Sequence, residues 1–179
     1  LATTWNELAQ EKWKLSLELD LGAAPVWIQG DYSHIQQALE NLLFNARDAT
    51  FEMRNHLREK ARLSGGEGAG PLSAQRRQAL IDAAGWKGNI VLRTRRLAKE
   101  AVLEVADNGI GMTDEVRRRC TETHFSTKRD NALFAGLTAG MGLGLSFVMV
   151  ILDHHQARLE IESRPLEGAC FRLRFHGAE

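Results

Sequence analysis

The sequence is poor in cysteine, carries no excess of charge of either sign and lacks any long apolar run. Its two cysteines, Cys120 and Cys170, show no metal-binding spacing and suggest a reducing compartment. The 23 Lys and Arg residues balance 23 Asp and Glu residues, which argues against general nucleic-acid binding. No segment approaches the ~18 apolar residues of a membrane-spanning helix. These absences leave an ordinary globular domain as the expectation.

The chain has 179 residues, which is enough for one domain with a real hydrophobic core. Its first residues, Leu1–Thr4, include neither an initiating Met nor signal-peptide character, so we interpret the chain as a fragment of a longer protein. We expect this fragment in the cytoplasm. A membrane anchor elsewhere in the parent protein is compatible with the sequence.

The most informative stretch is an apolar segment, Val102–Ala106, that runs into Asp107-Asn108-Gly109-Ile110-Gly111-Met112. Glycine permits a backbone turn with positive φ and the close approach of a flat ligand. A carboxylate at the end of a strand can accept a hydrogen bond from the exocyclic amine of adenine. By itself, an Asp-x-Gly-x-Gly pattern is more often a simple turn.

The clearest predicted helix begins after Gly30, where Asp31 or Ser33 can cap it and Ser33-x-x-Gln36 fits a capping box. Its apolar residues recur with helical spacing for four turns, up to Ala49. Asn41, Asn45 and Asp48 form a polar stripe along the border of this apolar face. Their oxygen atoms could coordinate Mg²⁺ and meet nucleotide phosphates, although a solvated helix border is the commoner meaning of such a stripe.

A second glycine-rich stretch places Gly140, Gly142 and Gly144 directly before an apolar helix, 147–152. Bare backbone N–H groups followed by a helix N-terminus form an anion-binding site. The helix is apolar nearly all round, so we expect it to be buried. Upstream, Lys128 with two neighbouring hydroxyls is a further, weaker candidate for a phosphate contact.

The remaining pattern predicts strands at 15–21, with one buried face, and at 26–28, 89–96, 102–106, 158–162 and 171–175. The last two form a hairpin through 165–168. Between Arg54 and Lys87 the helical pattern breaks down, and 64–71 is a Gly-rich linker before a modest helix at 72–84. We interpret this region as an insertion that is either decoration or a partner-docking element.

Four motifs then match one family in order. Asn41–Ala46, Asp107–Met112, Phe125–Lys128 and Gly140–Leu145 resemble the N box, first glycine box, F box and second glycine box of sensor histidine kinases. The resemblance covers about 15–175, apart from the insertion. It implies the Bergerat ATP-binding fold that histidine kinases share with gyrase, heat-shock-90 chaperones and MutL.

The resemblance implies an α+β fold: a two-layer α/β sandwich with a mixed, mostly antiparallel sheet and helices on one face. It also implies ATP and Mg²⁺ as ligands, with Asp107 at the adenine amine, Asn45 at Mg²⁺ and 129–139 as the lid. Asn41, Asn45 and Lys128 would be the catalytic group. The nucleotide would be bound by Asn41, Asn45, Asp48, Asp107, Gly109, Gly111, Met112, Phe125, Thr127, Lys128, Gly140, Met141, Gly142, Leu143, Gly144 and Leu145.

The resemblance also points to a branch of the family, because the ATP-hydrolysing clamps carry a general-base Glu where this chain has Asn41. We therefore expect transfer of the γ-phosphoryl group to a histidine on a separate dimerisation domain, and from there to a response-regulator aspartate. An ATP-hydrolysing clamp and a non-catalytic nucleotide-binding module remain alternatives. The chain departs from the family at Gln156-Ala157, where a glycine pair is usual, and at Ala169, where Thr is frequent.

We expect residues 1–179 to be one catalytic domain with an insertion at about 55–88. No phosphoacceptor motif, a His followed by an acid, Arg or Asn, and Pro, occurs in the sequence. The expected partners are therefore a helical dimerisation and phosphoacceptor domain of the same protein and a response regulator, with no nucleic acid. The full-length protein is expected to be a homodimer.

Overall fold

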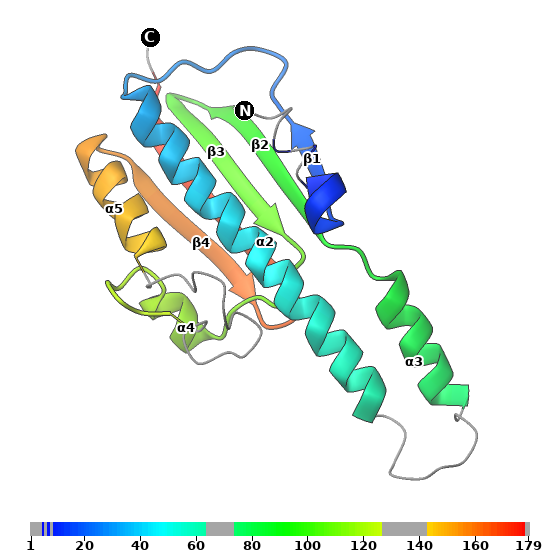
Figure 1. The fold of residues 1–179 in the computed structure, drawn as a ribbon. Helices are drawn as coiled ribbons and strands as arrows, with labels where there is room; N and C mark the ends of the chain where they lie inside the picture. The colour runs from blue at the N-terminus through cyan, green and yellow to red at the C-terminus, as the bar shows by residue number, and fades with distance from the viewer. Residues whose placement is uncertain (1–4, 6, 8, 64–73, 127–142, 178–179) are drawn as a thin grey trace.

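A five-stranded sheet forms one layer of the protein (Figure 1). The computed structural model describes residues 5, 7, 9–63, 74–126 and 143–177. The strand order is β1-β2-β3-β5-β4, in which β1 pairs with β2 in parallel and every other pair is antiparallel. This confirms the predicted mixed, mostly antiparallel sheet. The strands are β1 (Ser16–Asp20), β2 (Asn89–Leu97), β3 (Glu100–Asp107), β4 (Arg158–Arg164) and β5 (Gly168–His176).

One long helix and one shorter helix cover one face of this sheet and run antiparallel to each other (Figure 1). They are α2 (Tyr32–Leu63) and α5 (Gly144–His154). A short helix, α4 (Asp114–Arg119), lies near the lower end of β4, and α3 (Ala74–Gly85) packs beside the C-terminal half of α2. A π-helical turn, η1 (Ala9–Trp13), precedes β1. The expected two-layer α+β sandwich is therefore confirmed.

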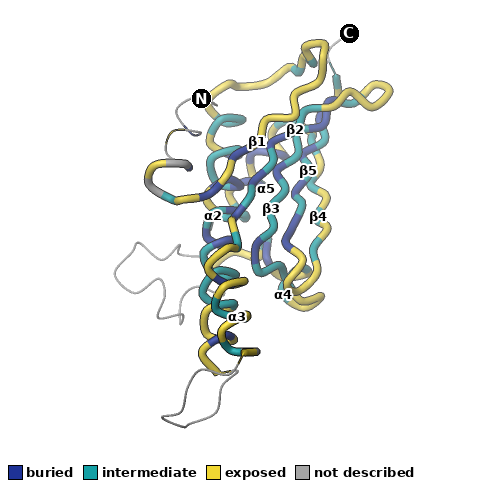
Figure 2. Tube along the Cα trace, turned by 90° about the vertical axis from the view of Figure 1, so that its right-hand side faces the viewer, coloured by how far each residue is buried: buried dark blue, intermediate teal, exposed yellow. Residues whose placement is uncertain are grey.

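The core lies between the sheet and the helices α2 and α5, as Figure 2 shows by the dark segments that face one another. Odd-numbered residues of β3 and β5 point toward the helices because successive side chains of a strand alternate between its faces. Val105 faces Phe171 across these strands, and both are buried. The largest fully buried side chains are Leu42, Leu152, Leu173, Val105, Val148 and Thr50.

The opposite face of the sheet carries ion pairs, and none of the described helices covers it. Glu104 of β3 lies between Arg93 of β2, at 2.5 Å, and Arg172 of β5, at 2.7 Å. Arg174 likewise joins Glu100, at 3.0 Å, and Glu160, at 2.7 Å. Alternating charges across neighbouring strands satisfy one another, so this face stays solvated while the other face is packed.

Three expectations about the elements were wrong. Residues 26–28 do not form a strand: Ile28 makes an isolated bridge with Gly177, and Trp27 is 73% exposed. The first strand does not bury one whole face, because Leu19 is 43% exposed on a strand at the edge of the sheet. The helix α5 is not buried all round, because Val150 is 62% exposed while Val148, Ile151 and Leu152 are buried.

The helix α2 also continues further than its apolar period. The pattern ends near Ala49, but the helix runs to Leu63 through residues with strong helix propensity. Packing against α3, with Ala61 buried, replaces the sheet contact that the apolar stripe provides earlier. Loss of the apolar period therefore marked the end of the sheet contact, and the helix itself ended later.

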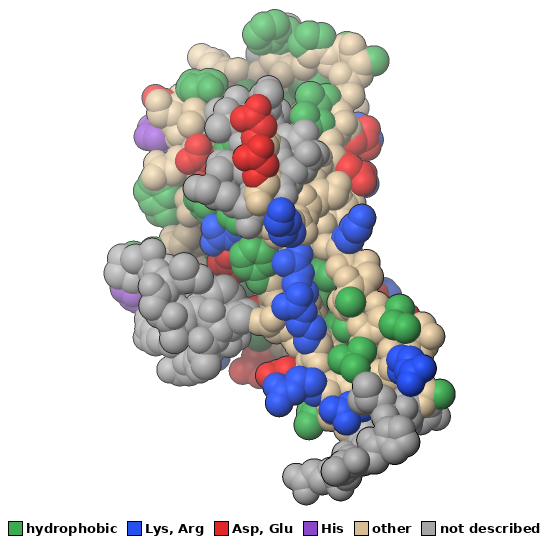
Figure 3. Space-filling view, turned by 45° about the vertical axis from the view of Figure 1, so that its right-hand side comes forward, with side chains coloured by type: hydrophobic (Ala, Val, Ile, Leu, Met, Phe, Trp, Pro, Cys, Tyr) green, Lys and Arg blue, Asp and Glu red, His purple; other side chains and the backbone are tan. Residues whose placement is uncertain are grey.

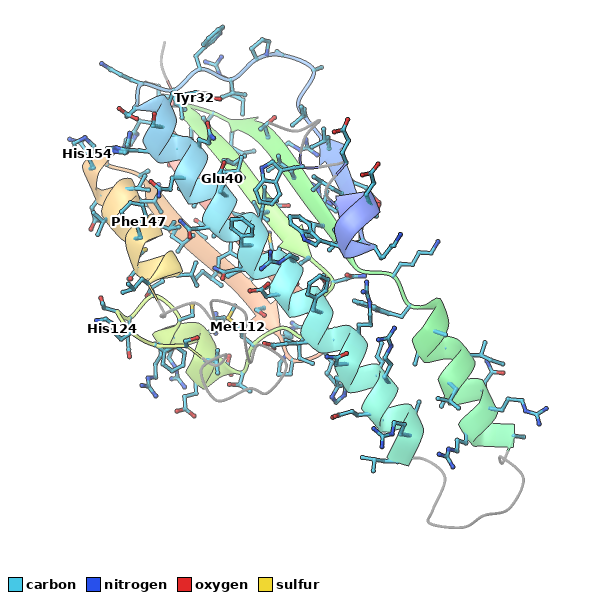
Figure 4. The ribbon with its side chains drawn as sticks, viewed as in Figure 1. Tyr32, Glu40, Met112, His124, Phe147 and His154 are labelled. Carbon is cyan, nitrogen blue, oxygen red and sulfur yellow. The ribbon has the colours of Figure 1, made fainter. Side chains whose placement is uncertain are left out.

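The start of α2 is held by Asp31, whose Oδ1 accepts from the His34 N–H at 3.0 Å. The predicted Ser33 capping box does not form, since Gln36 donates to Glu40 instead. The Asp31 N–H donates to Nε2 of His155 at 3.0 Å, which ties the end of α5 to the start of α2. Figure 4 shows this proximity by the labelled Tyr32 and His154.

None of the helices in the described segments combines the length and hydropathy that a membrane crossing requires.

Candidate functional site

The polar stripe of α2 faces the start of α5. Nδ2 of Asn41 donates to the Gln37 carbonyl at 3.0 Å. A Cβ placed on Gly144 would lie 3.2 Å from Oδ1 of Asn41, so the glycine leaves that oxygen an open approach. Asn45 follows one turn later on the same side of the helix. The stripe and the beginning of the second glycine box are thereby brought together.

Asp48 ends the stripe and is held in place by its neighbour. Its side chain is mostly buried, and Oδ1 pairs with Nη2 of Arg47 at 2.6 Å. The Arg47 guanidinium in turn lies 4.9 Å from the ring centroid of Phe44 and 5.2 Å from that of Trp13. Sequence reasoning missed Arg47, because a charged residue outside the apolar stripe gives no sign of an aromatic partner elsewhere in the chain.

Asp107 lies at the end of β3, directly opposite Ala169 of β5. Its Oδ1 accepts from the Gly109 N–H at 2.8 Å, and the Ala169 N–H is a second backbone donor. Burial raises the pKa of this carboxyl to about 7, and the two backbone hydrogen bonds offset that effect only in part. In the described part of the chain this buried carboxylate has backbone donors and no positive partner, which favours a ligand that brings another donor.

The two glycines after Asp107 are required by close packing. A Cβ on Gly109 would lie 2.5 Å from the carbonyl carbon of Ala49 in α2, and the Ile110 N–H donates to the Ala49 oxygen at 3.0 Å. Gly111 has φ of +67°, and a Cβ there would overlap the Arg164 carbonyl. Only glycine adopts such a backbone without strain.

The loop that follows Asp107 then contacts the β4–β5 hairpin. The Met112 N–H donates to Oγ of Ser163 at 2.9 Å, and this hydroxyl donates to the Gly168 carbonyl at 2.8 Å. Figure 4 labels Met112 between α2 and α4. Gly168 has φ of +86°, and a Cβ there would overlap the Asp107 carbonyl. Sequence reasoning had read Gly168 as a turn residue and did not single out Ser163, since a lone serine in a strand gives no signal.

These contacts converge on one segment of α2. Asn41 meets Gly144, and Ala49 meets Gly109, so the two glycine boxes reach the same helix about 12 Å apart along its axis. That distance suits a small molecule with a base at one end and phosphates at the other.

An open groove of about 730 Å³ lies where β3 and the β4–β5 hairpin end. Its lining takes in Asp107 but none of Asn41, Asn45, Gly109 and Gly111. It also includes Ala106, Glu162 and Cys170, which belong to the sheet face that points away from the helices, so this groove does not outline the nucleotide site. Its lining residues are Ala106, Asp107, Thr113, Asp114, Arg117, Glu162, Ser163, Arg164, Pro165, Glu167, Gly168, Ala169 and Cys170.

The F box and second glycine box are described only in part. The ring of Phe125 lies under the Arg119 guanidinium, 4.5 Å from it, after the α4 turn. Leu143 precedes α5, its carbonyl accepting from the Phe147 N–H at 2.9 Å, and Leu145 packs against the core. The expected site residues Thr127, Lys128, Gly140, Met141 and Gly142 lie outside the described residues, as does the expected lid at 129–139.

A metal cage built by the protein alone is not found in the described segments, where no three His, Cys, Asp or Glu residues gather. The oxygen atoms at the polar stripe are the carboxamides of Asn41 and Asn45 and the carboxylate of Asp48. Such oxygens fit Mg²⁺ when a ligand supplies further oxygens.

Residues 30–179 match a known family, described as histidine kinase-, DNA gyrase B- and HSP90-like ATPase. The chain is also similar to the phosphate regulon sensor protein PhoR of Pseudomonas aeruginosa, with 30% identity over 162 residues. That match covers 90% of this chain and 28% of PhoR. The chain spans less than a third of the length of each of the first curated relatives it matches.

Solved structures show the same fold. The catalytic domain of histidine kinase ThkA aligns over 98% of this chain and 88% of its own, with a TM-score of 0.65 and 19% identity. Full-length ShkA, solved in complex with AMPPNP, aligns over 99% of this chain and 28% of its own, with a TM-score of 0.67 and 18% identity.

Proposed function

Because the chain belongs to the histidine kinase-, DNA gyrase B- and HSP90-like ATPase family, we propose that it is the catalytic domain of a two-component sensor histidine kinase. In this proposal residues 1–179 form one ATP-binding domain with an insertion at about 55–88. The domain transfers the γ-phosphoryl group of ATP to a histidine on a separate dimerisation domain. Sensor kinases among its relatives support this branch.

The observation that carries the proposal is the convergence of both glycine boxes on residues 41–49 of α2. Asp107 would accept from the adenine amine, which is the donor that its buried carboxylate lacks. Gly109, Gly111, Met112 and the glycines up to Gly144 would line the nucleotide. The AMPPNP complex of ShkA, a protein of the same fold, adds support for a nucleotide in this fold.

Mg²⁺ fits the oxygen-rich stripe of α2. Asn45 would hold the ion, with Asn41 and Asp48 on either side of it and Lys128 at the phosphates. When bound, Mg²⁺ neutralises phosphate charge as the γ-phosphoryl group leaves. The protein's own part is positioning, since Arg47 orients Asp48 and Gly144 keeps the Asn41 oxygen accessible.

Asn41 favours phosphoryl transfer over hydrolysis. A carboxamide cannot take a proton from an attacking water, whereas a Glu at this position could. An imidazole nucleophile needs no such base. The proposed partners are therefore a dimerisation and phosphoacceptor domain of the same protein, in a homodimer, and a response regulator that receives the phosphoryl group.

The test combines nucleotide binding with transfer. Calorimetry on the 179-residue chain should show Mg·ATP binding that Asp107→Asn weakens. The chain alone should release phosphate slowly, and addition of the parent protein's dimerisation domain should give an acid-labile phosphohistidine. Rapid phosphate release by the chain alone would instead support the ATP-hydrolysing clamp. Binding without any transfer to the added domain would support a non-catalytic nucleotide module.

A further inference from the structure

The C-terminal half of α2 carries a row of three arginines. Arg54, Arg58 and Arg62 are spaced four residues apart, so they lie on one side of the helix with a rise of about 6 Å between neighbours. No carboxylate in the described residues forms an ion pair with any of the three. Figure 3 shows a column of Lys and Arg side chains on one side of the molecule, with Asp or Glu side chains beside its lower end. We call these three residues the arginine row.

Contacts of Arg54 with the rest of the protein hold its side chain in place although the three arginines repel one another. Like charges at i and i+4 destabilise a helix. Arg54 is half-buried, lies 5.6 Å from the Phe51 ring centroid and donates to the Lys14 carbonyl at 3.0 Å. Burial and the nearby charge of Arg58 both lower the pKa of Arg54. A partly desolvated guanidinium beside another cation calls for a negative partner.

The acids of this half of α2 do not supply it. Glu52 lies about 120° around the helix from the centre of the arginine row. Glu59 stands three residues before Arg62, but the two form no ion pair in the described structure. Most ion pairs of the described residues instead lie on the outer face of the sheet, where each Arg has its Glu or Asp. The sequence is neutral overall, yet these three neighbouring arginines have no ion-pair partner among the described residues.

Arg58 and Arg62 are exposed on the part of α2 that extends beyond the sheet beside α3 (Figure 1). The expected nucleotide residues of α2 end at Asp48, so a partner on the arginine row would leave the site accessible. The choice of arginine over lysine also indicates which chemical group the partner presents. Its planar guanidinium binds carboxylates through two parallel hydrogen bonds, which the point charge of Lys cannot do.

We propose that the arginine row is a docking surface for an acidic α-helix of a partner protein that presents a carboxylate once per turn. Carboxylates at i, i+4 and i+8 of such a helix repeat every ~6 Å, which matches the rise along the row. A lipid surface or a nucleic acid would also be attracted, but neither requires this register. This inference does not depend on the proposed kinase activity.

The test uses the whole 179-residue chain and a fluorescein-labelled helical peptide of Ala and Gln with Glu at every fourth position. A peptide of the same composition with its Glu residues clustered is the register control. We expect Arg58→Glu/Arg62→Glu to weaken peptide binding about tenfold in fluorescence anisotropy at 50 mM salt, through loss of charge pairs. The clustered peptide should bind at least about threefold more weakly than the periodic one.

The matched control is Arg96→Glu/Lys99→Glu, which changes the net charge equally at an exposed turn of the sheet. It should leave peptide binding within about twofold. Arg58→Gln/Arg62→Gln gives a milder variant in case charge reversal disturbs folding, and should weaken binding by an intermediate factor. Melting temperatures of all variants should differ by only a few degrees, because Arg58 and Arg62 are exposed.

Three outcomes would overturn the proposal. The first is equal binding of the periodic and clustered peptides. The second is equal loss in the control pair. The third is a preference of the arginine row for phosphatidylglycerol vesicles or an oligothymidylate over the periodic peptide, with the same sensitivity to Arg58 and Arg62. That last result would assign the row to a lipid or nucleic-acid partner instead.

Discussion

The guanidinium of Arg47 lies over the indole of Trp13, 5.2 Å from its ring centroid. This contact joins the segment before β1 to α2 at the point where Arg47 pairs with Asp48. Trp13 also lies 5.4 Å from Trp5 and 6.5 Å from Phe44, measured between ring centroids. The N-terminal turn is therefore fastened to the helix that carries the candidate magnesium site.

Trp13→Ala should lower the free energy of unfolding by about 2 kcal/mol, since it removes a half-buried aromatic ring and a cation–π contact. Urea denaturation at neutral pH measures this. Trp27→Ala is the matched control, because Trp27 is 73% exposed, and it should change stability by less than about 0.5 kcal/mol. Equal effects of the two substitutions would show that the aromatic cluster does not stabilise the fold.

Binding of ATP should release protons near neutral pH. Burial raises the pKa of Asp107 to about 7, so about half of the molecules carry a proton there at pH 7. An adenine amine that donates to the carboxylate would favour its charged form. Calorimetry in buffers of different ionisation enthalpy should detect release of up to about half a proton at pH 7. Asp107→Asn should abolish this release, and its persistence in the variant would assign the proton to another group.

The Asp107 carboxyl should also make the nucleotide-free protein less stable as pH rises. The folded state binds the Asp107 proton more tightly than the unfolded state, whose pKa is near 3.8. Its contribution to the free energy of unfolding therefore falls between about pH 4 and pH 7. Asp107→Asn should flatten that decline in urea titrations without ligand. A variant with the same pH dependence as the wild type would contradict the assignment.

Gly109→Ala should lower stability by about 1–3 kcal/mol and weaken ATP binding, because its Cβ would press on the Ala49 backbone and push the loop from α2. Gly85→Ala is the control, since a Cβ on Gly85 meets nothing within 4 Å. At this helix end it should be neutral or slightly stabilising. Urea denaturation measures the stability of both variants, and calorimetry measures their affinity for ATP. A Gly109→Ala variant with unchanged stability and affinity would contradict the close packing of Gly109 against Ala49.

Glu104→Gln should destabilise the sheet by about 1–3 kcal/mol, because two arginines lose a charged acceptor. Burial alone would raise the pKa of Glu104, but hydrogen bonds from Arg93 and Arg172 outweigh it and hold the pKa below its usual range. The contribution of this carboxylate is thus present above the unfolded pKa and is lost as pH falls through the folded pKa.

Acid titration checks that claim. The wild type should lose its advantage over Glu104→Gln as pH falls below about 4.5. Glu167→Gln is the control, because Glu167 is 66% exposed and lies 3.7 Å from Arg164, and it should have little effect. A pH-independent difference between wild type and Glu104→Gln would mean that packing, and not charge, accounts for the loss.

Sequence alone determined the features that depend on local periodicity and on ordered motifs. The apolar stripe of α2, the pairing of β2 with β3 and the closing hairpin followed from patterns of 3.6 and 2 residues. The family resemblance then supplied the layers of the fold and the candidate residues. Asp31 as the cap of α2 was one of two candidates that the sequence left open.

Tertiary structure decided which positions meet across distant parts of the chain. The exposure of Val150, the end of α2 at Leu63 and the single bridge at Ile28 depend on what lies against each element. The Arg47 guanidinium lies over the Trp13 ring, and Gly168 packs closely against the Asp107 backbone. Both contacts join residues that are far apart in sequence. A periodic pattern shows which face of an element will be buried. It does not show where that face stops being covered or which side chain arrives opposite, because packing between elements sets both.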